Sequence, residues 1–168
     1  MLARSLLVVL HALLVGWTLS SGAGARHLPD ATGVVIYRAP VVPLTVLRGF
    51  SPPATRYGAG HLGVDLAAHG AVRSAGAGTV LFAGSVAGRG VVVVLHPDGI
   101  RTEYEPLRPA VARGQHVAVG TVLGVVSGAH RGCPGSCLHW GARRGDTYLD
   151  PLRLLRPLGP VRLLPWAG

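Results

Sequence analysis

The sequence predicts an all-β protein of one domain, a sandwich or small barrel with short strands and Gly-rich turns. Short apolar segments rich in Val recur from residue 48 onward, and glycines separate most of them. No segment keeps helical periodicity over three turns. Aromatic residues make up only 5% of the chain, so the core of this sandwich or small barrel must be built from Val and Leu.

Six segments have the composition of strands, and one has that of a short helix. The expected strands are 79–83, 91–95, 100–105, 115–119, 122–126 and 138–142. The sequence His96-Pro97-Asp98-Gly99 is typical of a turn, so the second and third of these strands should form a hairpin. Residues 151–155 should form a last helical turn, which Asp150 caps.

The ends of the chain differ in composition from its centre. Residues 1–25 have one early positive charge, an apolar stretch, and small residues at Ala23 and Ala25, which is the pattern of a secretory signal peptide. An uncleaved anchor helix is the alternative. Residues 26–47 contain three prolines and read as a linker, 48–156 form the domain, and 157–168 form a tail. We therefore expect an exported, monomeric protein with no stable membrane span after cleavage.

Charge and residue usage exclude several functions. All 16 basic residues are Arg, which excludes functions that need a lysine amine, such as a P-loop or a biotin or lipoyl carrier. The formal net charge is +9, but the arginines are scattered and have no interleaved aromatics, so nucleic acid is not an expected partner. Anionic polymers of the cell envelope are the more plausible partners of an exported chain.

Two fragments carry the chemistry, Gly60-His61-Leu62-Gly63-Val64-Asp65 and Cys137-Leu138-His139-Trp140-Gly141. On a straight strand His61 and Asp65 would lie roughly 13 Å apart, but the two glycines permit a bend between them. Period-two alternation puts Cys137 and His139 on one face. His61, Asp65 and His139 together would give two imidazoles and one carboxylate with an open fourth position, which is typical of catalytic Zn²⁺.

The ordered series of motifs resembles the lysostaphin/LytM-type zinc peptidases, which cut peptide cross-links in bacterial peptidoglycan. The resemblance covers residues 49–155 and includes the two fragments above, Gly78-Thr79-Val80-Leu81-Phe82-Ala83-Gly84 and Val93-Val94-Leu95-His96-Pro97-Asp98-Gly99. It implies a barrel-sandwich hybrid fold and makes His61, Asp65 and His139 the zinc ligands. Peptidoglycan is then the expected partner and substrate.

Two departures from the family pattern bear on activity. Cys137 stands where the family has the first histidine of a His-x-His pair, and Pro106 stands where it has the histidine of Tyr-x-His-Leu. Those histidines are thought to orient water and stabilise the oxyanion. Glu105, Glu103 and His130 are the candidates for a substitute base, and strand alternation, which puts Glu105 on the face opposite to residue 106, weakens its case.

The two cysteines, Cys133 and Cys137, flank a Pro-Gly-containing loop, and in an exported protein we expect them to form a disulfide. Zinc ligation by Cys137 and free thiols remain alternatives. The sequence thus favours a secreted zinc metalloendopeptidase of the cell wall. A catalytically silent zinc-binding module that binds the wall or regulates an amidase is the second hypothesis.

Overall fold

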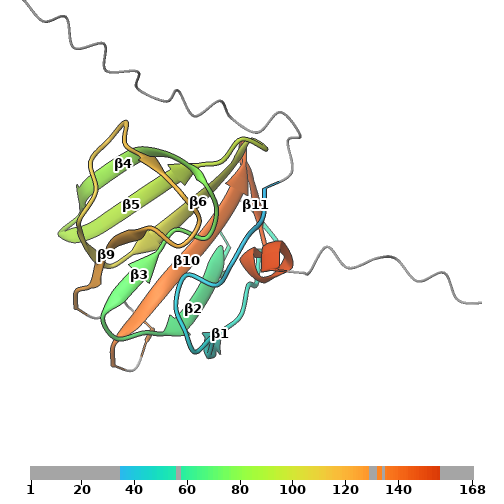
Figure 1. Ribbon diagram of the computed structural model, residues 1–168. Coiled ribbons are helices and arrows are strands. Elements are labelled where there is room, and N and C mark those ends of the chain that lie inside the picture. The colour runs from blue at the N-terminus through green and yellow to red at the C-terminus, as the bar shows by residue number, and fades with distance from the viewer. Residues whose placement is uncertain (1–34, 56–57, 129–131, 134, 156–168) are drawn as a thin grey trace, which may run out of the picture.

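The computed structural model describes residues 35–55, 58–128, 132–133 and 135–155, and these residues form two antiparallel β-sheets (Figure 1). The large sheet has the order β1-β2-β10-β6-β5-β4-β8, and β11 also pairs with β10. The small sheet has the order β3-β9-β7. The all-β prediction is confirmed. In the described part of the chain, no helix has the length and apolar character needed to cross a membrane.

The elements have the following bounds. The large sheet consists of β1 (Val46–Arg48), β2 (Gly63–Ala67), β4 (Gly78–Val86), β5 (Arg89–Leu95), β6 (Ile100–Glu105), β8 (His116–Val117), β10 (Cys137–Arg144) and β11 (Thr147–Leu149). The small sheet consists of β3 (Ala71–Arg73), β7 (Leu107–Pro109) and β9 (Val122–Val126), and η1 (Pro151–Leu155) is a short 3-10 helix.

The expected hairpin and the expected helical turn are both present. β5 pairs antiparallel with β6 through the turn at Gly99, whose φ of 81° favours glycine. At η1 the backbone N–H of Leu152 donates to Asp150 Oδ1 at 3.1 Å, as expected for a cap. Sequence patterning missed β2, because its residues are buried on both faces and do not alternate.

The core lies on one face of the large sheet, where alternate residues of neighbouring strands meet. Leu138 and Trp140 of β10 stand opposite Leu66 and Val64 of β2, and all four side chains are fully buried. Tyr104 of β6 stands opposite Trp140 on the other side. The remaining fully buried aliphatic side chains are mainly Val and Leu, as the scarcity of aromatic residues predicts.

A chain of hydrogen bonds crosses the core from the Ala75 N–H through His96 to the Ala77 carbonyl. The backbone N–H of Ala75 donates to Tyr104 Oη at 2.9 Å, so the Tyr104 hydroxyl donates to Thr102 Oγ1 at 2.9 Å. Thr102 Oγ1 in turn donates to His96 Nε2 at 2.8 Å, and His96 Nδ1 donates to the Ala77 carbonyl at 2.8 Å. Each hydroxyl accepts one hydrogen bond and donates another, and His96 accepts at Nε2 and donates at Nδ1, which requires a neutral imidazole. Burial lowers the pKa of His96.

The described part of the predicted linker, residues 35–47, packs on the domain. The side chain of Val41 is buried, the backbone N–H of Arg38 donates to the Ala75 carbonyl at 2.7 Å, and the ring of Tyr37 contacts that of His96. Burial, and then the neighbouring Asp98 carboxylate, raise the pKa of Tyr37. The structure therefore differs here from the linker prediction, since Pro-rich sequence can still supply buried apolar side chains. The predicted signal peptide and the tail 157–168 lie outside the described residues.

We expect the His96 chain to make folding stability depend on pH. The pKa of His96 is depressed in the folded state, so below its ordinary value of 6.5 the unfolded chain takes up a proton that the folded chain does not. The free energy of unfolding of the metal-free protein should therefore fall as the pH drops through 6.5. Urea unfolding at pH 7 and pH 5 measures this, and the fall should be smaller in His96→Gln. An equal fall in both proteins would contradict the assignment.

Candidate metal centre

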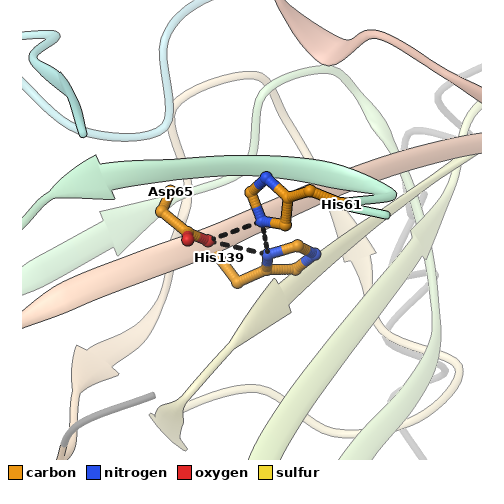
Figure 2. Close-up of side chains that lie close together, drawn as sticks. All are labelled: His61, Asp65 and His139. Carbon is orange, nitrogen blue, oxygen red and sulfur yellow. Dashed lines mark hydrogen bonds and ion pairs between the residues drawn. The ribbon is translucent and has the colours of Figure 1, made fainter. Parts of the chain in front are cut away.

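Three side chains from separate parts of the sequence converge beside the large sheet (Figure 2). His61 Nε2 lies 3.0 Å from Asp65 Oδ1, and His139 Nδ1 lies 2.9 Å from the same oxygen. The two imidazole nitrogens are 3.1 Å apart. His61 and Asp65 are buried, and His139 keeps 16% of its side chain exposed, so the cluster opens to solvent on the His139 side.

The bend predicted between His61 and Asp65 is present. β2 begins only at Gly63, and His61 precedes it in an isolated β-bridge to Ser51. A Cβ atom at Gly60 would lie 2.7 Å from the backbone nitrogen of Pro53, so this close approach of the chain requires glycine. Because His61 stands outside the strand, it need not follow the strand spacing that would separate it from Asp65.

The hydrogen bond on the other side of the His61 ring sets its tautomer. Nδ1 donates to the Gly49 carbonyl at 2.8 Å, which leaves Nε2 with a lone pair directed at the cluster. A backbone carbonyl that orients an imidazole in this way is the usual support of a metal-binding histidine. Sequence reasoning missed Gly49, because a backbone oxygen leaves no signal in residue type.

The donor set fits a metal ion. Asp65 Oδ2 is buried and, within the described residues, has no hydrogen-bond partner. A buried carboxylate oxygen without a partner is costly. Two imidazole nitrogens and a carboxylate oxygen that meet at one point are ligands that Zn²⁺ accepts in tetrahedral sites with one open position. His61, Asp65 and His139 could therefore hold a metal ion together.

Glycine provides the space in which His139 sits. A Cβ atom at Gly63 would lie 2.6 Å from His139 Nε2, so any side chain there would displace the imidazole. Gly141, two residues beyond His139 on β10, has no such neighbour, since its nearest atom would be Glu103 Cβ at 3.6 Å. Gly63 and Gly141 stand opposite each other in the register of β2 and β10.

Both acidic candidates for the base lie on the same face as the cluster. In an antiparallel pair, residues directly opposite each other point to one face, and the register of β6 and β10 pairs Glu105 with His139 and Glu103 with Gly141. Glu105 Oε2 lies 3.4 Å from Arg89 Nε, and Glu103 Oε1 lies 3.2 Å from Arg143 Nε. His130 lies outside the described residues.

Neither of the two residues that stand where the family has a histidine can transfer a proton as an imidazole does, since one is a proline and the other is a cysteine in a disulfide. Pro106 is buried directly after β6. Cys137 is buried and forms a disulfide with Cys133, with a Cα–Cα distance of 6.4 Å, inside the normal range. The disulfide is therefore present in the structure, and within the described residues neither cysteine is free to act as a metal ligand.

The residues of the candidate metal centre lie in a segment that matches a known protein family. Residues 59–151, which contain all three converging side chains, match the sequence profile of peptidase family M23. The chain belongs to peptidase family M23. The resemblance to the lysostaphin/LytM-type peptidases is thereby confirmed.

Several relatives of this M23 chain are known. Uncharacterized proteins of Mycobacterium tuberculosis and Mycobacterium bovis are 41% identical to it over 171 residues, which cover 98% of this chain. The chain spans 64% of the length of these curated relatives. Helicobacter pylori Csd3 is 29% identical, with a TM-score of 0.58, over 72% of this chain and 35% of Csd3. A chain of the SpoIIQ–SpoIIIAH pore-forming complex is 25% identical, with a TM-score of 0.62, over 72% of this chain and 91% of its own length.

Because a Cβ atom at Gly63 would meet the His139 ring, alanine at Gly63 and alanine at Gly141 should have different effects on metal affinity. Gly63→Ala should lower the affinity about 10- to 100-fold, because the new methyl group displaces the His139 ring. Gly141→Ala should stay close to the parent, because its methyl group meets only ordinary contacts. Competition with a chromogenic chelator, with Zn²⁺ as the probe, measures both. Equal affinities would contradict this placement of His139.

The disulfide predicts a specific mass. Protein isolated without reductant should weigh two hydrogens less than the reduced chain and should not react with iodoacetamide, because both sulfurs are in the bond between Cys133 and Cys137. Intact mass spectrometry before and after reduction decides this. Alkylation of both thiols in the unreduced protein would rule the bridge out.

Proposed function

We propose that this M23 chain is an exported, zinc-dependent endopeptidase that cuts peptide cross-links of peptidoglycan. The observation that carries the proposal is the convergence of His61 Nε2, Asp65 Oδ1 and His139 Nδ1 within 3.1 Å of one another on an open sheet face. Family membership supports peptidase chemistry. A Zn²⁺ ion in this position would supply Lewis-acid activation of water and of a peptide carbonyl.

Each protein group around the site has a role in this proposal. His61 is held in the ligand tautomer by Gly49, and Asp65 contributes the negative charge that offsets part of the charge of the ion. His139 lies nearest to solvent, so substrate approaches from its side.

Glu105 is the residue we propose as general base. Its register position opposite His139 brings its carboxylate to the same face as the ligands, although the adjacent Pro106 offers no imidazole. The Arg89 guanidinium of β5 lies 3.4 Å from that carboxylate and forms an ion pair with it. A carboxylate so placed can accept the proton of the attacking water, as carboxylates do in other zinc proteases. Glu103 lies one cross-strand pair farther from His139 and is the weaker candidate.

The second candidate function is a catalytically silent module that binds the wall or a partner protein. It is favoured by Pro106 and Cys137, which stand where the family has histidines, and by the buried disulfide that removes Cys137 from proton transfer. A fold neighbour that belongs to a pore-forming complex supports it as well. Metal binding does not separate the two functions, whereas turnover does.

The zinc-loaded protein should release soluble fragments from purified peptidoglycan. His61→Ala should abolish this release, because it removes a ligand, and Glu105→Gln should lower the rate about 10²- to 10⁴-fold, the usual contribution of a general base. Asp146→Asn, a change of the same kind at an exposed turn, is the matched control and should behave as the parent. A parent that binds one zinc ion but releases nothing would exclude the peptidase.

Introducing the two histidines of the family pattern tests whether the parent protein is catalytically silent. The triple variant Pro106→His, Cys137→His and Cys133→Ser regains both auxiliary histidines without leaving an orphan thiol. If the parent is a weak peptidase, the variant should cut the same bond faster. If only the variant cuts, with zinc bound equally by both, the parent is a silent module.

A further inference from the structure

Two arginines of the large sheet stand directly opposite each other, Arg101 on β6 and Arg143 on β10. Both point to the same face, since they are a cross-strand pair, and both are partly buried. Like charges in this position destabilise a sheet. Because the repulsion between the two arginines costs stability, we expect either a carboxylate of the protein that offsets it or an anionic ligand that binds there.

The compensation within the described residues is incomplete. Glu103 is the one carboxylate within ion-pair distance, with Oε1 3.2 Å from Arg143 Nε, and Arg101 has no ion pair in this part of the chain. Arg143 Nε is buried and forms no hydrogen bond among the described residues, although it lies within ion-pair distance of Glu103. The cluster of Arg101, Arg143 and Glu103 thus retains one net positive charge and at least one unsatisfied donor.

The cluster lies on the same face as the candidate metal centre. Arg143 is four residues from His139 along β10, which corresponds to about 13 Å, or about four residues of extended peptide. Gly141 lies between them and is buried, with the Glu103 side chain over it, since a Cβ atom there would lie 3.7 Å from Glu103 Oε2. Tyr148 of β11, the partner of Arg143 on its other side, is exposed and lines a pocket of about 410 Å³ that Arg153 also lines.

We propose that Arg101 and Arg143 form a subsite for a carboxylate of the peptide substrate, about 13 Å from the metal centre. The inference rests on the proposed peptidase function, because it places the peptide on the face that carries His139. Guanidinium groups bind carboxylates through paired N–H donors, and a bound carboxylate would neutralise the repulsion between the two arginines.

The charge of the cluster favours a carboxylate over a phosphate polymer. One net positive charge matches one carboxylate, whereas Glu103, which adjoins Arg143, would repel a second negative charge on a phosphate. The adjoining pocket at Tyr148, which Phe50 and Leu154 also line, suits a peptide residue with an apolar side chain better than a bare polymer backbone.

Binding to the metal-free full chain tests the proposal, since a chelator prevents the peptide carboxylate from binding a metal ion instead. The probes are soluble peptidoglycan peptides whose carboxylates are either free or chemically converted to carboxamides. The parent should bind the free form about tenfold more tightly, and the double variant Arg101→Gln, Arg143→Gln should bind both forms equally. Arg108→Gln, at the exposed position of β7 in the small sheet, is the matched control and should keep the preference.

The outcomes distinguish this inference from the proposed function. A parent with no preference for the free carboxylate, or a double variant that keeps it, overturns the subsite even if the zinc-loaded protein cuts peptidoglycan. A preference lost only in the double variant supports the subsite even if the parent never cuts. Equal binding of both peptides, together with tight binding of polyphosphate to the parent, would assign the arginines to a phosphate polymer and overturn the proposal. Thermal unfolding of the double variant checks that it is folded, because the substitutions remove both the repulsion between the arginines and the ion pair of Arg143 with Glu103.

Discussion

The pairing of β2 with β10 is the constraint on which the rest of the molecule depends. It places His139 opposite Asp65 on one face and Leu138 opposite Leu66 on the other. A shift of one residue would turn Asp65 and His139 into the core and expose the Leu and Trp side chains. Burial of Trp140 and its neighbours therefore fixes the register, and the same register assembles the candidate metal centre.

One face of the large sheet forms the hydrophobic core, and the other carries the candidate metal centre. One face packs Val, Leu, Trp140 and Tyr104 into the core, and the His96 hydrogen-bond chain satisfies the polar groups buried there. The other face carries the candidate metal ligands, Glu103 and Glu105, and the arginines that pair with them. Because β6 and β10 contribute alternate residues to both faces, substitutions on the open face can change binding or catalysis with little effect on the core.

The departures from the family pattern leave carboxylates, and no imidazole of the two auxiliary positions, beside His139. Pro106 and the disulfide at Cys137 leave the region beside His139 without its two auxiliary histidines, while the register brings Glu105 directly next to it. Arg89 forms an ion pair with Glu105, and Arg143 forms one with Glu103. Among the described residues, this face carries two Arg–Glu ion pairs, and the cluster of Arg101, Arg143 and Glu103 lies on the face where we propose that the peptide substrate binds.

The sequence by itself determined the all-β class, the hairpin at Gly99 and the cap at Asp150, because turn chemistry and alternation are local properties. It identified His61, Asp65 and His139 through the order of their motifs and the resemblance to a known family. It did not determine β2, whose two-sided burial hides its alternation, or the packing of residues 35–47. Only the tertiary structure decided that Gly49 sets the tautomer of His61, that Gly63 makes room for the His139 ring and that Glu105 and Arg101 face β10. These depend on backbone atoms and on strand register, which bring together residues far apart in the chain and leave no local pattern.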